Sequence, residues 1–425
     1  MKTVDRDRLN KRWDLVAVGV LVNTCLGTVY SWSIFRSPLE ALLSIGAAES
    51  GIPYSVFLGV FAFTMPLAGN VISRFGTRAT LAVGGALLGA GWIGAGLSSS
   101  LGATIVTYGV IGGAGVGFAY GVPLVVAASW FPARRGLAMG VTLAGFGVSP
   151  FLTAPLAEYL IGRFGVERAM ITLGIFFVAI IWLLAPLLRR YDERRQTAEP
   201  GAIPAPAERD ASAGILGELR PREMLRTVSF YGFWVCFGIG TLAGLTAIGM
   251  TASFGREAAG VSAASAAVAV SAFGVLNGVG RPIFGALHDA LGVRLTAVIS
   301  FAIIAVGAAI SMLVEPGVEW PFYLGFGLFW LMLGGWLAVA PAATNRLFGS
   351  QNQAKNYGIM YTAYGVGALA GGLVSGVLHA EYGSFDPLFV FILFLCGLGG
   401  VIALLTLPTR GRSPEEPSSR RRGLL

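Results

Sequence analysis

The chain has 425 residues, of which 55% are hydrophobic and only 12% are charged, and its mean hydropathy is +0.72. Soluble globular domains carry about 25% charged residues, so this composition excludes a soluble protein. The basic residues of a linker and of the terminal tail, Arg420, Arg421 and Arg422, contribute to a formal net charge of +8. It indicates attraction to anionic membrane lipid and not binding to nucleic acid.

Apolar runs of about 20 residues recur along the chain without strand-like alternation, which predicts an all-α membrane protein. A polar segment rich in Arg, Glu, Pro and Ala predicts a cytosolic linker at 189–228. It separates an N-terminal bundle of six helices, residues 1–188, from a C-terminal bundle, residues 229–408, and a cytosolic tail follows at 409–425. The twelve predicted spans are 14–35, 54–72, 80–98, 103–128, 138–160, 169–188, 229–253, 262–288, 294–313, 321–344, 357–379 and 386–408.

Basic residues predict the orientation of these spans. Of the 30 Lys and Arg residues, 25 fall on the N-terminal side of the membrane under this topology. Cytosolic loops carry the excess of positive charge, so we expect both termini to be cytosolic in a multi-pass protein of the inner membrane.

The two halves of the chain repeat one another. Pro66–Arg78, PLAGNVISRFGTR, aligns with Pro282–Arg294, PIFGALHDALGVR, at an offset of 216 residues. Further along, Phe146-Gly147 aligns with Tyr364-Gly365 at an offset of 218. The nearly constant offset indicates duplication of a six-helix unit, an arrangement in which transporters place substrate between the halves.

Arg281 is the only basic residue that falls inside a predicted span away from its ends, and Asn277 lies four residues earlier on the same helix face. In a helix that runs from outside to inside, the guanidinium leans toward the bilayer centre. Charges in spans are costly and usually functional, which favours a clamp for a substrate carboxylate over an arginine that reaches the inner surface or a helix-end carbonyl. Asn277 either assists the clamp or bridges two helices.

Five aromatic residues are further candidates for the same cavity. Tyr120 lies about as far from the cytosolic end of its helix as Arg281 does from its own, so its hydroxyl is expected at a similar depth. Phe146, the repeat partner of Tyr364, is expected to form an apolar wall. Tyr30 and Tyr361 complete the set, and each of these residues has interhelical packing as its alternative.

The repeated segments GNVISRFGTR and GALHDALGVR resemble the G-x-x-x-D-R-x-G-x-R loop of the major facilitator superfamily. The second copy keeps its acid as Asp289, whereas the first has Ser73 there. The resemblance implies the major facilitator fold, with twelve helices in two pseudo-symmetric bundles. In that family the loop braces neighbouring helices on the cytosolic side.

Four segments, TVYSWSIFRSPLE, WFPARRGLAMG, PREMLRTVSFYGFW and NYGIMYTAYG, look like the branch of oxalate–formate antiporters and monocarboxylate transporters. In that branch an arginine of the eighth helix binds the substrate carboxylate, and Arg281 matches it. Animal monocarboxylate transporters carry an aspartate where this chain has Asn277 and a lysine where it has Ile34. The antiporter carries a second cation at the position of Tyr364, so its absence here argues against a dianion.

These features predict a secondary transporter of small monocarboxylates such as L-lactate or pyruvate, with proton symport by alternating access as the family expectation. Exchange of one carboxylate for another is the main alternative. An enzyme is not expected, because the sequence offers no nucleophile or His/Cys/Asp constellation. We expect no cofactor and no metal. His379 and Glu381 could handle protons at the outer surface, although a solvated helix end is the simpler interpretation.

Overall fold

The computed structural model describes residues 2–131, 135–188, 214–349 and 351–409, and these fold almost entirely into helices. The helices are α1 Lys2–Leu26, a 3₁₀ helix Gly27–Ser31, α2 Trp32–Leu43, α3 Ala47–Ser50, α4 Ile52–Gly96, α5 Leu101–Thr104, a π-helix Ile105–Gly112, α6 Gly113–Ala119, α7 Gly121–Trp130, α8 Arg135–Phe164, α9 Val166–Leu184, α11 Pro221–Met224, α12 Val228–Glu257, α13 Ala263–Ser311, α14 Trp320–Phe348, α15 Gln353–Tyr382 and α16 Asp386–Thr406.

Within the described residues, 11 helices are long and apolar enough to cross a membrane. One of them, α13, has 49 residues. At 1.5 Å per residue a straight helix of that length would span about 74 Å, more than twice the hydrocarbon thickness of a bilayer. It is instead broken at Gly292, where φ is 80°. The predicted eighth and ninth spans therefore form its two arms.

The repeat is visible in the backbone at two glycines 216 residues apart. Gly76 has φ 79° and ψ 170°, and Gly292 has φ 80° and ψ 172°. A side chain is disfavoured at such positive φ, which explains why both copies have glycine. The hydroxyls of Thr80 and Thr296 donate to the carbonyls of these glycines, both at 2.8 Å. The two halves thus turn back by the same local structure.

The residues that follow each glycine brace the last helix of the same half. The Thr77 hydroxyl donates to the carbonyl of Leu188 at 2.8 Å, and Arg294 Nε donates to the carbonyl of Leu407 at 2.6 Å. Thr77 and Arg294 occupy neighbouring positions when the two copies of the repeat are aligned. The side chain of Ser73 and most of the predicted linker, residues 189–213, lie outside the described residues.

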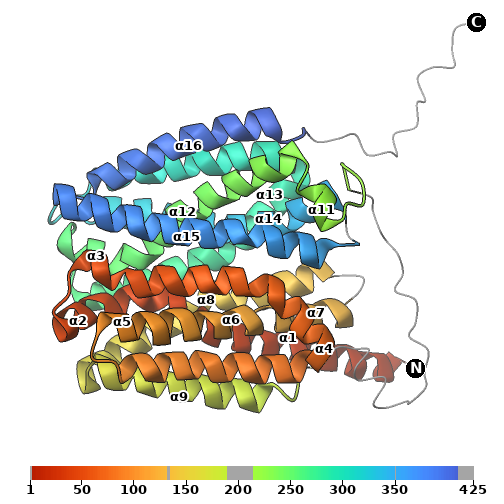
Figure 1. Ribbon diagram of the computed structural model, residues 1–425, viewed down its shortest axis with the longest axis horizontal. Coiled ribbons are helices and arrows are strands. Elements are labelled where there is room, and N and C mark those ends of the chain that lie inside the picture. The colour runs from red at the N-terminus through yellow and green to blue at the C-terminus, as the bar shows by residue number, and fades with distance from the viewer. Residues whose placement is uncertain (1, 132–134, 189–213, 350, 410–425) are drawn as a thin grey trace, which may run out of the picture.

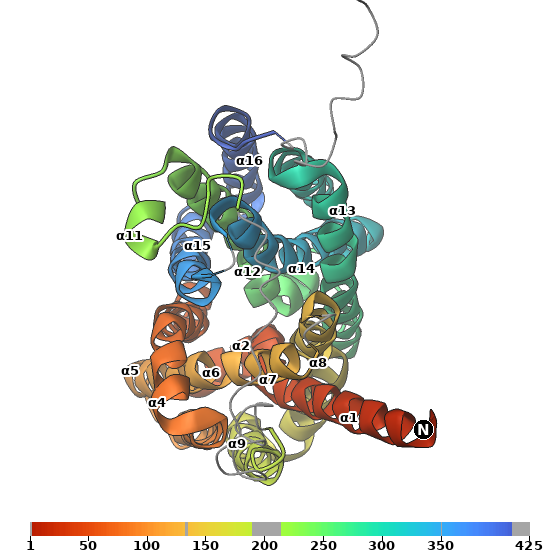
Figure 2. The same ribbon diagram turned by 90° about the vertical axis from the view of Figure 1, so that its right-hand side faces the viewer.

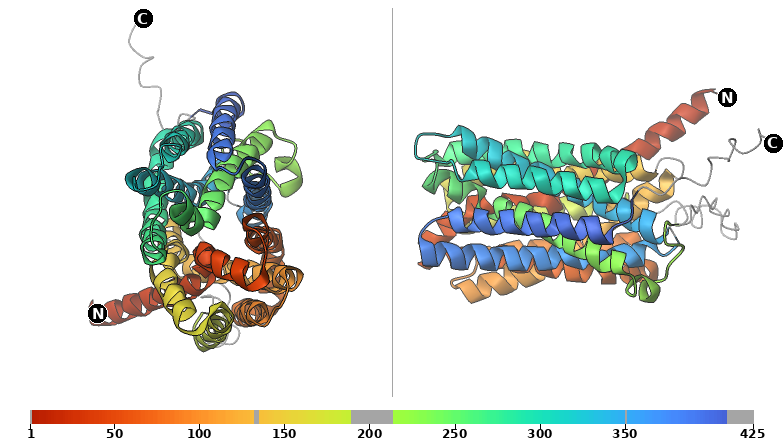
Figure 3. Two further views of the ribbon diagram at one scale, coloured as in Figure 1. Left: turned by 90° about the vertical axis from the view of Figure 1, so that its left-hand side faces the viewer. Right: turned by 90° about the horizontal axis from the view of Figure 1, so that it is seen from above.

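Figure 1 shows the helices running along the long axis, with the start of α1 and the end of α16 at one end. We call the opposite end, which holds α2 and α3, the distal end. Viewed along the axis, the helices from α1 to α9 form one group and those from α12 to α16 form another (Figures 2 and 3). The groups meet where α8 packs on α13 and where α4 packs on α15.

Glycines permit the close approach at these two contacts. A Cβ on Gly147 of α8 would lie 2.7 Å from Asn277 Oδ1, and one on Gly365 of α15 would lie 2.7 Å from the Ala62 Cβ of α4. The two glycines are the repeat partners noted in the sequence. Each half therefore contributes an equivalent helix to the interface.

The first span is longer than the sequence predicted. A helical span runs over Trp13–Leu43, whereas the expected end was residue 35. Arg36 and Glu40 lie inside this span, and they tolerate their position because each has polar partners there. The extension brings a second arginine into the space between the two groups of helices.

Candidate functional site at the centre of the interface

Arg281 is buried, with 3% of its surface exposed. Its Nη1 donates to the carbonyl of Leu143 on α8 at 2.7 Å, and its Nη2 donates to Asn277 Oδ1 at 3.4 Å. Both acceptors are neutral. Its Nε has no hydrogen-bond partner, and no ion pair joins Arg281 to any residue that the structure describes. The side chain therefore points into the interface and reaches from one half to the other.

Asn277 links Arg281 to the rest of the C-terminal half. Its Nδ2 donates to the carbonyl of Trp330 on α14 at 3.1 Å, while its Oδ1 accepts from Arg281. Of the two roles expected from the sequence, the bridge between helices is present here. The same amide also holds the guanidinium in place, so it positions the charge.

The five predicted aromatic residues gather next to Arg281, and each is at most 2% exposed. The Tyr30 and Tyr364 hydroxyls lie 3.1 Å apart and share a hydrogen bond across the interface. Phe146 packs edge-on against Tyr30 at 5.0 Å and against Tyr120 at 5.3 Å between ring centroids. Tyr361 stacks on Tyr364 at 4.8 Å. The charge of Arg281 acts electrostatically on the hydroxyls of Tyr30, Tyr120 and Tyr361.

Phe61 of α4 lies at the middle of this cluster, although the sequence did not single it out. Its ring lies 5.2 Å from Tyr120, 5.6 Å from Tyr361 and 5.8 Å from Tyr364. It also lies 6.1 Å from Phe146. Phenylalanine is common in apolar spans, so only the packing of α4 against α15 identifies it as a residue of the centre. We call these six aromatic residues the central aromatic cluster.

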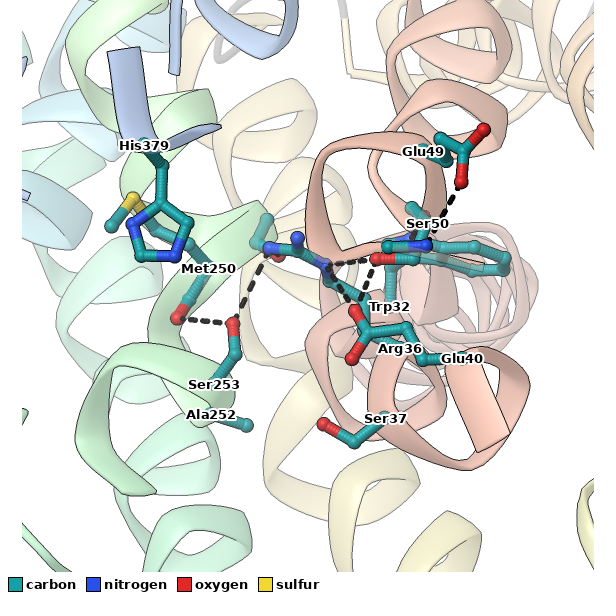
Figure 4. Close-up of polar contacts among 12 residues, drawn as sticks. Trp32, Arg36, Ser37, Glu40, Glu49, Ser50, Met250, Ala252, Ser253 and His379 are labelled. Carbon is teal, nitrogen blue, oxygen red and sulfur yellow. Dashed lines mark hydrogen bonds and ion pairs between the residues drawn. The ribbon is translucent and has the colours of Figure 1, made fainter. Parts of the chain in front are cut away.

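A second polar group lies at the distal end and was also missed. Arg36, with its side chain 12% exposed, donates from Nε to Ser50 Oγ at 3.0 Å. Its Nη1 donates across the interface to the carbonyl of Gly249 at 3.2 Å and to Ser253 Oγ at 3.3 Å, both on α12 (Figure 4). The i, i+4 spacing of Arg36 and Glu40 was the available signal, because it is typical of a continuing helix.

The two histidines do not form a metal site. Within the described residues no group of three His, Cys, Asp or Glu side chains could hold a metal ion. His379 Nε2 lies 3.9 Å from a carboxylate oxygen of Glu257 on α12. No hydrogen bond or ion pair joins His379 to Glu381 among the described residues, and the carboxylate beside His379 is that of Glu257.

A buried cation between two bundles of membrane-spanning helices is the architecture of a membrane transporter that binds its substrate between the halves. Comparison with known families agrees with this class. The Major Facilitator Superfamily matches the chain over residues 16–257 and again over 235–424, and the chain belongs to this family. It is therefore an all-α transporter with twelve spans in two pseudo-symmetric bundles.

Individual relatives place the chain in one branch of the family. It is 29% identical to the oxalate:formate antiporter of Oxalobacter formigenes over 419 residues, which covers 96% of both chains. It is 28% identical to monocarboxylate transporter 10 of Danio rerio, over 88% of this chain and 71% of the relative. Identity to human monocarboxylate transporter 12 is 24%, over 93% and 79%. The branch expected from the sequence is thus confirmed.

Proposed function

We propose that the protein is a secondary transporter of small monocarboxylates such as L-lactate or pyruvate. The observation that carries the proposal is the Arg281 guanidinium, which is buried, unpaired by any described carboxylate, and held by two neutral acceptors. An uncompensated buried charge costs on the order of several kcal/mol. A carboxylate ligand would supply the missing charge and accept two parallel hydrogen bonds from the guanidinium.

The surroundings of Arg281 favour one negative charge over two. The central aromatic cluster offers hydroxyls and ring edges, and the contact opposite Tyr364 is another tyrosine hydroxyl. A monoanion would be neutralised by one guanidinium, whereas the second carboxylate of a dianion would lose water without a cation to replace it. The tyrosine hydroxyls can donate to a carboxylate or accept from a 2-hydroxyl group. Phe146 and Phe61 would limit the substrate to a few carbon atoms.

For transport, the two halves would rock about the central cluster, with both termini in the cytosol and the distal end facing outward. The contacts of Gly147 and Gly365 lie along helices that stay side by side during such a movement. Proton symport is our proposal for the coupling. Protonation would let the loaded and empty carriers share the same net charge, since the proton offsets the carboxylate.

Exchange of one carboxylate for another is a second candidate, because a relative that is 29% identical is an oxalate:formate antiporter. The two mechanisms give opposite results in proteoliposomes. A symporter accumulates labelled substrate when the outside is acidified, and a protonophore abolishes the accumulation. An exchanger needs unlabelled carboxylate inside and does not respond to the protonophore.

The test of the substrate site is uptake of labelled L-lactate by purified protein in proteoliposomes, compared with oxalate and formate. Arg281→Ala should abolish uptake, and Arg281→Lys should reduce kcat/KM by about 10- to 100-fold, since lysine keeps the charge but loses the bidentate geometry. Arg163→Ala, which removes an exposed arginine from the end of α8, is the matched control. Normal uptake by Arg281→Ala would refute the proposed clamp.

A further inference from the structure

A cleft opens at the distal end, between the two halves and apart from Arg281. The space inside it that a ligand could occupy is about 40 Å³, room for about three water molecules. The cleft exists because its walls on α12 and α15 carry small residues, among them Gly249, Gly372 and Gly376. We call it the distal cleft.

A polar group in the wall of the distal cleft lacks a partner. The Thr246 hydroxyl of α12 is buried and makes no hydrogen bond, and the residue is 7% exposed. It faces α15, since a Cβ on Gly371 would lie 2.1 Å from its oxygen. Ser55, Ser253 and Ser375 add hydroxyls to the same walls. An unpaired buried hydroxyl costs about 1–3 kcal/mol, which a polar ligand in the cleft would recover.

Arg36 supplies the positive charge of the distal cleft. Its hydrogen bonds to Ser50, Gly249 and Ser253 go to neutral oxygens, and its Nε also forms an ion pair with Glu40 at 3.9 Å. Figure 4 shows the guanidinium between α2 and α12, with His379 on the far side. A ligand carboxylate would bind Arg36 more strongly than a backbone carbonyl does, because both partners would be charged.

The charged groups around Arg36 are balanced. Glu40 on α2 and Glu257 on α12 act on it as negative charges, and Arg256 on α12 acts as a positive one. Arg256 also donates to Ser37 Oγ of α2. Two arginines thus face two glutamates. Glu49 of α3 is engaged elsewhere, accepting from the Gly46 amide at 2.9 Å.

The distal cleft leads toward the central site. Tyr54 lines the cleft and donates from its hydroxyl to the carbonyl of Leu245 on α12 at 3.2 Å. Its hydroxyl is near enough to those of Tyr30 and Tyr364 to interact with them electrostatically. The Tyr30–Tyr364 pair in turn belongs to the central aromatic cluster beside Arg281. Tyr54 therefore connects the wall of the distal cleft to the central aromatic cluster.

We propose that the distal cleft is a second binding site for a small monocarboxylate, in which Arg36 binds the carboxylate and Thr246 donates to it. The site rests on the proposed function, since its ligand is the transported anion on its way to Arg281. Binding replaces the bonds from Arg36 to Gly249 and Ser253. These bonds join α2 to α12 across the interface, so capture of the anion also releases a contact that closes the distal end.

Thr246→Val provides the cleanest test. Valine has nearly the same shape, and the lost hydroxyl has no partner in the unliganded protein, so the melting temperature should not fall. The KM for L-lactate should rise about tenfold from the distal side, by the loss of one hydrogen bond to a charged group, and kcat/KM should change by the same factor for both directions of transport, because a carrier has no preferred direction at equilibrium. Thr241→Val, on the same helix outside the cleft, is the control.

Arg36→Gln and Arg36→Lys give an independent measurement. We expect a larger rise in the distal-side KM for glutamine than for lysine, measured in vesicles of both orientations. In an Arg281→Ala background, L-lactate should still raise the melting temperature, and Arg36→Gln should abolish that shift. An unchanged distal-side KM in Thr246→Val, or equal losses of kcat from both sides in Arg36→Gln, would overturn the second site and leave only a structural contact.

The failure of the two proposals can be told apart. If the wild-type protein transports L-lactate but neither substitution changes the distal-side KM, only the proposal of a distal site is refuted. If the wild-type protein neither binds nor transports any monocarboxylate, both the proposed function and the proposed distal site are refuted.

Discussion

Gly147 is the position at which a single methyl group tests the link between helix packing and substrate binding. A Cβ there would lie 2.7 Å from Asn277 Oδ1 and 3.2 Å from the backbone of Gly278. The amide cannot simply rotate away, because Asn277 is bonded to the Trp330 carbonyl and to Arg281. Gly147→Ala must therefore separate α8 from α13 or displace the group that orients the guanidinium.

The expected magnitude combines opposing effects. Alanine in a helix interior gains about 1 kcal/mol over glycine, and overpacking costs about 1–3 kcal/mol. The net effect on stability is therefore a loss of at most about 2 kcal/mol. Loss of the bond between Asn277 and the charged Arg281 is worth about 1.5–3 kcal/mol, which predicts a 10- to 100-fold fall in kcat/KM.

The matched control is Gly140→Ala on the same helix, where a Cβ would meet nothing within 4 Å. It should gain the helix propensity without the clash, and it should transport normally. Both variants are assayed for L-lactate uptake in proteoliposomes and for melting temperature in detergent. If Gly147→Ala transports as well as Gly140→Ala, then Asn277 does not position Arg281 through this contact.

Three further predictions concern other contacts of the fold. Tyr30→Phe and Tyr364→Phe each leave the partner hydroxyl buried and unpaired, which costs about 1–3 kcal/mol. The double variant should therefore lose less stability than the two single variants lose together. Strictly additive losses in melting temperature would contradict the shared hydrogen bond. Gly334→Ala places a Cβ 1.9 Å from a backbone carbonyl and should sharply reduce the yield of folded protein, whereas Gly400→Ala, with open space, should not. Arg294→Ala removes a bond to the end of α16 and should lower the melting temperature while the KM for L-lactate stays the same; a raised KM would show that the brace reaches the substrate site.

The sequence was sufficient for the spans, the repeat and the buried charge. Long apolar runs can only be helices in lipid, because every backbone hydrogen bond must be made within the segment. The aligned glycines Gly76 and Gly292 proved to share one backbone conformation. Arg281 could be identified because a charge is conspicuous against an apolar background.

Only the tertiary structure decided what these residues touch. Phe61 has no distinguishing mark in the sequence, and Arg36 looked like the end of a span until Ser50, Gly249 and Ser253 were found around it. Such contacts join residues that are up to several hundred positions apart, as in the pair of Tyr30 and Tyr364. Periodicity reports which face of a helix is polar, but the partner of that face depends on how the two halves pack together.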